Sequence, residues 1–470
     1  MATYHFTVSV VSRARGHRIV AHAAAQSGTR LRDEYYGGIH NGTRTGSRGS
    51  RGLVEIAEIR APHAAPSWVH DREQLWNRVE AAERRKDAQL ARKVEISLPL
   101  ELDPEQSAAL LRAFVDAEFV SQGMIADIAI RRPSADRPGA HVLLSLRALT
   151  PAGFGPARFG PKARAWNRKA NLIEWRAAWA RCANTHLALA GHRVRIDHRT
   201  LEDQQIELTA ARTTGVSPRW DGERPLPPYI QQRLAEQRDI ARQNGEAILA
   251  DPSLAIRALA RQRSVFTRED LVRFLTSRTG DAAQLEAALG SVLGSSELVS
   301  VARRDDGAAW TSRDLIEAEK SLMRRAQTMA ARRGHGTAGS AAETPPQSSP
   351  QGPDAFVHAT GEGDFKAIAL PQDTKSEILS AMRALWEAHG YRVRTALRAE
   401  DQEPLANNDV VVIEGAEMIE LKALERLLAT AERARAKLVL VADAAQLRAL
   451  GPLAPMYSLY QAFGSQEPRP

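Results

Sequence analysis

Apolar and polar residues alternate along the first 230 residues in a way that predicts strands and helices in turn. A two-residue period, typical of strands, occurs at about 3–11, 53–60, 93–99 and in both halves of 125–147. A period of three to four residues, typical of amphipathic helices, occurs at about 19–31, 67–91, 103–123 and 164–190. Because strands and helices are mixed along the chain, we expect an α+β domain in which helices flank a largely antiparallel sheet.

Cap and turn residues sharpen two of these expectations. Asp103 is placed to cap the third helix, with Pro104 in its first turn and Gly123 at its end, and Ser67 is a plausible cap for the second helix. The stretch "IRRPSADRPGAH" is a polar loop marked by proline, so it predicts a connection between two paired strands. His141 stands at the start of the second of these strands.

The rest of the chain changes character twice. A proline-marked stretch, "SPRWDGERPLPPY", predicts that the first domain, 1–229, ends there. Residues 230–334 are helical in pattern and include a winged-helix-like segment, "SVFTREDLVRFLTSRTG". Residues 335–364 have linker composition and are predicted to be disordered. Residues 365–470 place apolar strands between helices, which predicts a partial parallel α/β sheet.

The charge of the chain favours a polyanionic partner. The net charge is +8 and the isoelectric point about 9.8. Arginines crowd a Gly/Ser/Thr-rich loop, "GGIHNGTRTGSRGSRG", and a second basic loop follows at "GFGPARFGPKARAWN", where a tryptophan is available for stacking. The candidate DNA-binding residues in these loops are Arg44, Arg48, Arg51, Lys162, Arg164, Trp166 and Arg168.

Cysteine usage and hydropathy favour a cytoplasmic protein. The one cysteine, Cys182, lies in a helical pattern and has no partner in the chain for a disulfide. No run of apolar residues is long enough to span a membrane, and the first residues lack the pattern of a signal peptide.

Seven pieces of the chain, in order, resemble the relaxase domain of the MobA/MobL family in its relaxase–helicase form. The pieces are "YHFTVSVVSR", "AAERRKDAQLARKVEISLPLEL", "FVSQGMIADIAI", "HVLLSLR", "GFG…KARAWN", "WRAAWARCANTHLALAG" and "RIDHRTLEDQQI". The resemblance covers 1–208, continues at 254–335 with the start of a helicase region, and ends at 365–460 with a shortened, RecA-like ATPase domain. It implies a role in conjugative DNA transfer.

Relaxases of this family nick one DNA strand with a tyrosine, assisted by a divalent metal held by three histidines. The resemblance puts Ala25 at the nucleophile position, in "VAHAAAQSG". It puts Arg131 at the first metal position and Gly139 at the second, which leaves His141 as the one histidine of the set. A methyl group cannot attack phosphorus, and one imidazole does not define a metal geometry. The resemblance therefore implies a degenerate member of the family.

Other residues could restore the chemistry. Tyr35 or Tyr36 could replace the nucleophile, with His22, His40 or Asp136 as further donors for Mg²⁺ or Mn²⁺. Arg131 could stabilise phosphate charge without a metal, because a guanidinium matches phosphate oxygens. Glu95 could orient His141, or could be structural. Without such a rescue no cofactor is expected.

The ATPase-like segment is altered in the same way. A phosphate loop needs G-x-x-x-x-G-K-[ST], and the corresponding piece here is "ALPQDTKSE", with Ala369 and Thr374 in place of both glycines. The residues that would belong to the nucleotide site are Lys375, Ser376, Glu414, Asp443 and Gln446. With the chain stopping soon after "ADAAQL", ATP-driven unwinding is not expected.

Three hypotheses follow from the sequence. The first is a catalytically silent protein that still binds single-stranded or origin-of-transfer DNA, or other proteins of the transfer machinery. The second is an active nicking enzyme that uses displaced residues. The third is a decayed paralogue or a scaffold without DNA affinity.

Overall fold

The structure, a computed structural model, forms two compact units. It describes residues 4–42, 53–132, 138–152, 155–192, 194–204, 206–209, 228–301, 308–337, 352–395, 404–419, 421–450 and 455–464. One unit contains residues 1–187 and 194–241, and the other contains residues 188–193 and 242–470. The division falls inside a helix, α5 (Pro228–Ala250), rather than at the predicted boundary of 229.

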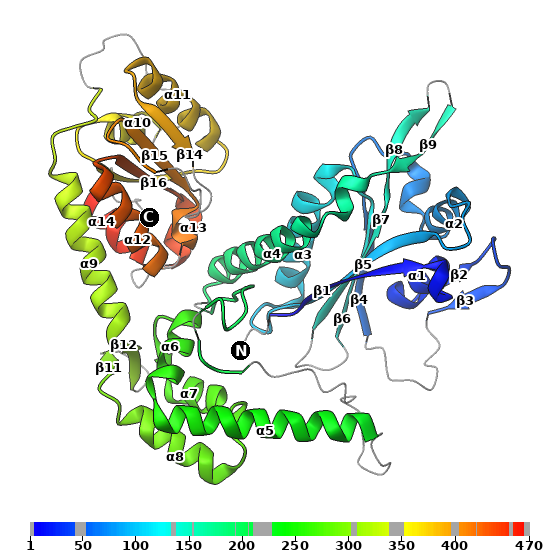
Figure 1. The fold of residues 1–470 in the computed structure, drawn as a ribbon. Helices are drawn as coiled ribbons and strands as arrows, with labels where there is room; N and C mark the ends of the chain where they lie inside the picture. Colours follow the sequence, from blue (N-terminus) through cyan, green and yellow to red (C-terminus); the bar gives the residue numbers. More distant parts are fainter. Residues whose placement is uncertain are drawn as a thin grey trace. The chain divides into compact units, whose positions relative to one another are not determined.

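The first unit is built on a five-stranded antiparallel sheet with the order β1-β5-β7-β6-β4 (Figure 1). The strands are β1 (Phe6–Ser12), β4 (Leu53–Arg60), β5 (Gln89–Ser97), β6 (Ala126–Arg132) and β7 (Gly139–Ser145). This confirms the predicted antiparallel α+β fold.

Helices cover both faces of this sheet. The helices are α1 (Ile19–Ser27), α2 (Arg72–Ala82), α3 (Pro104–Glu118) and α4 (Lys169–Leu189). α1 and α2 pack on one face, where Val20 and Trp76 join Leu143 in a fully buried core. α3 and α4 pack on the other face, where the ring of Phe114 contacts those of Phe6 and Trp179.

Two hairpins of this unit have no counterpart among the predicted elements. β2 (Arg30–Arg32) pairs with β3 (Ile39–Asn41), and β8 (Arg147–Ala152) pairs with β9 (Gly155–Lys162). The β8–β9 hairpin occupies most of the stretch predicted as a basic loop. The second helix also differs, because its cap is Asp71, not Ser67, and it ends at Ala82. Asp103 and Pro104 act as predicted, with a capping box at Asp103 and Gln106. The helix ends earlier than predicted, at Glu118, and Gly123 ends a separate 3-10 turn, Val120–Gln122.

The second unit begins with a winged-helix arrangement. Its elements are α6 (Ser253–Gln262), β10 (Phe266–Thr267), α7 (Arg268–Thr276), α8 (Ala282–Leu293), β11 (Leu298–Val301) and β12 (Ala309–Ser312). The three strands form one antiparallel sheet with the order β10-β12-β11.

A long helix, α9 (Arg313–Ala330), leads from the winged helix to a parallel sheet with the order β13-β16-β15-β14. The strands are β13 (Phe365–Leu370), β14 (Arg392–Thr395), β15 (Asp409–Glu414) and β16 (Lys437–Asp443). The helices around them are α10 (Gly352–Thr360), α11 (Lys375–Ala388), α12 (Leu421–Ala434), α13 (Ala444–Leu450) and α14 (Pro455–Phe463). α10 lies inside the range 335–364 that was predicted to be a linker.

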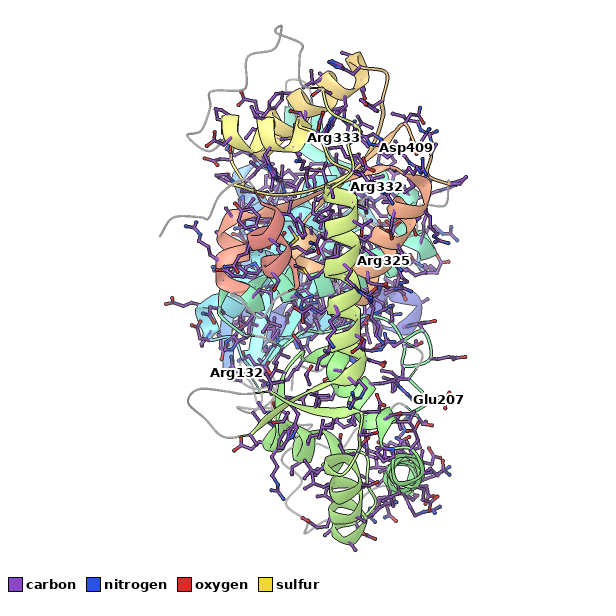
Figure 2. All side chains as sticks on the ribbon, turned by 90° about the vertical axis from the view of Figure 1, so that its left-hand side faces the viewer. Arg132, Glu207, Arg325, Arg332, Arg333 and Asp409 are labelled. Atoms are coloured by element: carbon purple, nitrogen blue, oxygen red, sulfur yellow. The ribbon has the colours of Figure 1, made fainter. Side chains whose placement is uncertain are left out.

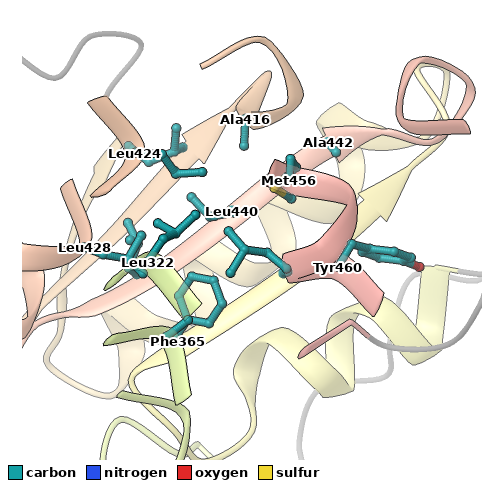
Figure 3. Packing of buried hydrophobic residues seen from close by; sticks show 14 of the residues in the cluster. Leu322, Phe365, Ala416, Leu424, Leu428, Leu440, Ala442, Met456 and Tyr460 are labelled. Atoms are coloured by element: carbon teal, nitrogen blue, oxygen red, sulfur yellow. The ribbon is translucent and has the colours of Figure 1, made fainter. Parts of the chain in front are cut away.

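Both faces of the parallel sheet are buried. On one face Leu322 of α9 and Leu428 of α12 pack against Phe365 and Leu440 of the strands, as Figure 3 shows. α10 and α11 cover the other face, where Trp386 is fully buried. The strands are therefore almost continuously apolar, and such a pattern predicts the parallel α/β sheet that the structure shows.

Charged side chains tie α9 to the rest of the second unit. Arg325 projects from α9 to Glu425 and Glu432 of α12, and Arg332, just beyond the helix, lies 3.7 Å from Asp364 (Figure 2). Among the helices in the described ranges, none is long and apolar enough to cross a membrane.

Candidate functional site

The residues that correspond to the family's metal site meet at one end of the first sheet. His141 of β7 lies between Glu95 of β5 and Ala129 of β6 in the register of the sheet. Arg131, two residues beyond Ala129, lies beside Gly139. Since side chains two residues apart share a face, Glu95, His141 and Arg131 lie on the same face of the sheet. This is the face that α1 and α2 cover in part.

His141 is engaged by a carboxylate. Its Nδ1 lies 3.4 Å from Oε1 of Glu95, and Nζ of Lys93 donates to the same oxygen at 2.6 Å. Hydrogen bonds from His141 and Lys93 lower the pKa of Glu95 to about 2, against the opposing effect of burial. The carboxylate is therefore charged at neutral pH and orients the imidazole. The contact that the sequence suggested for Glu95 is present.

Arg131 binds the end of a helix. Its Nε donates to the carbonyl oxygen of Gln26 at 2.9 Å, and its Nη2 donates to that of Ala25. The residue is 6% exposed. Both carbonyls belong to the last turn of α1, where a cation is favoured by the helix dipole. Arg131, at the position that the resemblance assigns to the first metal ligand, thus bonds to Ala25, at the position that it assigns to the nucleophile. Its guanidinium points to main-chain carbonyls of the protein.

The described residues do not form a metal site. No group of three or more His, Cys, Asp or Glu among them is arranged to hold a metal ion. His22 packs its ring against His17 at 5.1 Å, and Nε2 of His40 lies 3.1 Å from Oδ2 of Asp33. Asp136 lies outside the described residues. A divalent metal with three imidazole ligands thus does not fit the residues present at this end of the sheet.

Tyr35 and Tyr36 lie at the other end of α1 from Ala25. Gly42, at the base of the β2–β3 hairpin, lies against the carbonyl of Ala24, so close that any side chain would clash with it. At the tip, the ring of Tyr36 lies against the guanidinium of Arg18, the residue that precedes α1. The hairpin therefore runs along α1 and carries both tyrosines away from the nucleophile position.

The basic residues of the second loop have different surroundings. Nζ of Lys162 lies 3.0 Å from Oε2 of the buried Glu83, so this lysine closes the β8–β9 hairpin onto the end of α2. Trp166 is 8% exposed, so it cannot stack on a base in this conformation, and the proposed stacking role is corrected to packing. Arg164 and Arg168 are exposed and remain candidates. Arg44, Arg48 and Arg51 lie outside the described residues.

The carboxyl edge of the parallel sheet collects the residues that correspond to a nucleotide site. Lys375 begins α11, and its Nζ lies 3.4 Å from Oε2 of Glu414 at the end of β15. Asp443 ends β16 and caps α13 by accepting from the amide of Gln446. Ser376 is exposed on α11. The lysine is thus paired with the carboxylate across the sheet edge.

Two groups at these sites were not predicted from the sequence. Glu417 is buried beside β16 and accepts from the amide of Asp443, and burial raises its pKa to about 7. Arg13 lies over Tyr35 as Arg18 lies over Tyr36. An Arg-x-x-x-x-Arg spacing before a Tyr-Tyr pair is the signal for these contacts, but it is too common to have been singled out.

Comparisons with known proteins agree with the family resemblance. Residues 18–220 match the MobA/MobL family, and residues 381–467 match a family described as an AAA domain. The probable conjugal transfer protein TraA of Sinorhizobium fredii is 29% identical over 95% of this chain and 46% of its own length. The conjugal transfer protein TraA of Rhizobium radiobacter is 28% identical over the same shares. The chain thus spans about half the length of these relatives.

A further relative is matched over a larger share of its own length. The mobilization protein MobL of Acidithiobacillus ferridurans is 30% identical over 57% of this chain and 75% of its own length. A solved structure titled "Molecular Basis of Vancomycin Resistance Transfer in Staphylococcus aureus" is 32% identical, covers 42% of this chain and is itself covered completely, with a TM-score of 0.39. With its family match in the first unit and its AAA domain in the second, the chain belongs to the MobA/MobL family.

Proposed function

We propose that this protein takes part in plasmid mobilisation or conjugative transfer by binding single-stranded DNA of a transfer origin without nicking it. The observation that carries the proposal is the bond from Arg131 to the carbonyls of Ala25 and Gln26. Nicking in this family needs a hydroxyl and a metal at these positions, and here the two positions hold a methyl group and a structural guanidinium. What supports DNA binding is the family, the names of its relatives and the net charge of +8.

Nicking by displaced residues finds little support in this geometry. The two tyrosines lie at the far end of α1, and the described residues supply no group of metal ligands around His141. The proposal therefore separates recognition, which needs basic and aromatic surface, from strand cleavage, which needs a nucleophile and an electrophile in line.

The test is an assay for a covalent protein–DNA adduct. Labelled single strands, tiled across the DNA next to the gene, are incubated with the full chain and Mg²⁺ or Mn²⁺, then separated on a denaturing gel. We expect no adduct with the wild type. We also expect none with Ala25→Tyr, since a new hydroxyl lacks the metal that would stabilise the charge of the transition state. An intact family member serves as the positive control.

Binding is measured on the same strands by fluorescence anisotropy. We expect an affinity that falls steeply with salt, with a slope of about −0.7 in log–log units for each phosphate contacted. An adduct with the wild type would overturn the silent assignment. An absence of binding even at low salt would overturn the DNA-binding assignment and leave a scaffold or a decayed paralogue.

A further inference from the structure

The tip of the β2–β3 hairpin presents two adjacent aromatic rings to solvent. Tyr35 is 54% exposed and Tyr36 is 41% exposed, and their ring centroids lie 4.8 Å apart in an edge-to-face arrangement. Ile39, at the start of β3, is 54% exposed beside them in sequence. Large exposed apolar groups that gather at one turn are typical of a contact surface.

The turn is fixed from beneath. The buried carboxylate of Asp33 accepts from the amides of both tyrosines and contacts His40. Asn77 of α2 accepts from the amide of Glu34 and donates to the carbonyl of Arg32. Since main-chain groups on both sides of the tip are bound, the rings are held in a set position before any ligand arrives, which reduces the entropy lost on binding.

Each ring lies against an arginine. The guanidinium carbon of Arg13 lies 4.5 Å from the centroid of Tyr35, and that of Arg18 lies 4.7 Å from the centroid of Tyr36. Arg13 is anchored in turn, because its Nε donates to Glu80 at 2.6 Å and its other nitrogens donate to carbonyls of residues 80, 83 and 85. Arg18, by contrast, is exposed. The two cations therefore differ: one supports a ring, and the other faces solvent.

The sequence from Arg13 to Gly42 carries an excess of positive charge. Residues 13–42 contain five arginines and only two acidic residues, Asp33 and Glu34. Of the two acids Asp33 is buried and already bound within the turn. Exposed aromatic rings, fixed in place and flanked by arginine, match the chemistry of a single strand, whose bases stack while its phosphates meet guanidinium groups. A paired duplex keeps its bases stacked inside and offers no such faces.

We infer that Tyr35 and Tyr36 form a stacking platform for unpaired bases of single-stranded DNA, with Arg18 on the adjacent phosphate. The inference rests on the proposed function and assigns to these tyrosines a binding role in place of the nucleophilic one. The platform lies at the N-terminal end of α1. Arg18 and Ala25 are seven residues apart, about 10 Å along the helix axis.

The experiment compares affinities of the full chain for a labelled oligothymidylate and for a duplex of equal length. We expect Tyr35→Ala and Tyr36→Ala each to weaken single-strand binding by about 5- to 100-fold, the loss typical of one stacked base. Tyr35→Phe and Tyr36→Phe keep the rings and should bind like the wild type. The salt slope should stay unchanged in the tyrosine variants and become shallower in Arg18→Ala, which loses a phosphate contact. Duplex binding should change little in any tyrosine variant.

A matched control is Tyr229→Ala. Tyr229 is 60% exposed, lies in α5 and has the guanidinium of Arg233 6.0 Å from its ring, so it offers the same chemistry without the hairpin. Its replacement should leave the affinity unchanged. If the alanine variants of the hairpin bind as the wild type does, the platform is wrong while the DNA-binding function stands. A loss in the phenylalanine variants as large as in the alanine variants would overturn stacking in favour of a role of the hydroxyls. A wild type that binds neither probe would overturn both proposals.

Discussion

A buried guanidinium is stable only when its N–H groups meet acceptors, and at Arg131 these acceptors are carbonyls of a helix end. The last carbonyls of a helix have no partners within the helix, so the contact satisfies both sides at once. Gly28, which ends α1 with a positive φ of 72°, lets the chain turn away beside this arginine. The position is thus adapted to structure, and a histidine could not bridge the same two carbonyls.

Arg131→Ala should destabilise the first unit. We expect the free energy of unfolding to fall by about 1–3 kcal/mol, because the carbonyls of Gln26, which is buried, and Ala25, which is partly buried, lose their donor. Arg131→Lys should lose less, since an ammonium can keep one of the two bonds. The measurement is urea unfolding of the full chain, followed by tryptophan fluorescence.

The matched control is Arg85→Ala. Arg85 pairs with Asp87 on the surface, with side chains 82% and 62% exposed, and such pairs contribute about 0–1 kcal/mol. If both replacements lower the free energy of unfolding by the same amount, the contacts of Arg131 with α1 do not stabilise the first unit as proposed.

The candidate site could be located from the sequence, but the roles of its residues could not. The resemblance fixed the positions of Ala25, Arg131 and His141, and the structure brings the latter two to one end of the sheet. What the guanidinium binds depends on where α1 ends relative to β6, and this is decided by the tertiary structure. The burial of Trp166 and the pairing of Lys162 with Glu83 are tertiary in the same sense.

At the scale of elements, long periodic segments were predicted well and short hairpins were missed. β2 and β3 have three residues each, too few to show a period. The exposed residues of β2 are arginines, and those of β3 are Ile39 and Asn41. The β8–β9 hairpin contains glycine and proline, which read as a loop, and its pairing has register shifts. α2 ended early because Gln89 and its neighbours pair with β1 and β7 instead of continuing the helix.

The winged helix of the second unit is a weak candidate for DNA reading. In helix-turn-helix folds the second helix of the pair enters the major groove, and here that helix is α8. Its sequence, "AAQLEAALGSVL", has no lysine or arginine and one acid, Glu286. We therefore expect the DNA contacts in the first unit, where Tyr35 and Tyr36 lie at the tip of the β2–β3 hairpin.

The first residue of β16 predicts a pH dependence of stability. Lys437 is fully buried, and its Nζ donates to the carbonyls of Gly361 at 2.6 Å and His335 at 3.3 Å. Burial lowers its pKa to about 7 from an ordinary 10.5. Between these two values the unfolded chain binds more protons than the folded chain, so the free energy of unfolding rises with pH across this window.

Lys437→Met should remove this contribution to the pH dependence of the free energy of unfolding. The free energy of unfolding of the wild type, minus that of the variant, should therefore increase from pH 7 to pH 10 in denaturant titrations. Lys422→Met, which removes a surface lysine paired with Asp314 at 3.0 Å, gives the background for losing one positive charge. A difference that stays flat with pH would show that Lys437 is not buried in its neutral form.

At the scale of the whole molecule, the resemblance implies chemistry at two unrelated sites, and structural contacts occupy both while both cores remain closely packed. In the first unit, Arg131 bonds to the end of α1 at the positions that the resemblance assigns to the nucleophile and the metal. In the second, Lys375 pairs with Glu414, Pro371 lacks a backbone donor, and Thr374 stands where a phosphate loop needs a glycine. A protein selected for binding alone would keep its folds and its surface and lose both kinds of chemistry.

Single-strand affinity should therefore be independent of metal and of nucleotide. We expect the same dissociation constant in EDTA, in Mg²⁺ and in Mg²⁺ with ATP, at matched ionic strength. Because Mg²⁺ also competes for DNA phosphates, an unrelated single-strand binding protein is measured in parallel, and its change in affinity is subtracted. The melting temperature should likewise stay constant, whereas a nucleotide present at 100 times its dissociation constant would stabilise the fold by about 2.7 kcal/mol. Binding that required Mg²⁺ would indicate a working metal site in the first unit. A response to ATP would indicate a working AAA domain, so each failure is assigned to one unit.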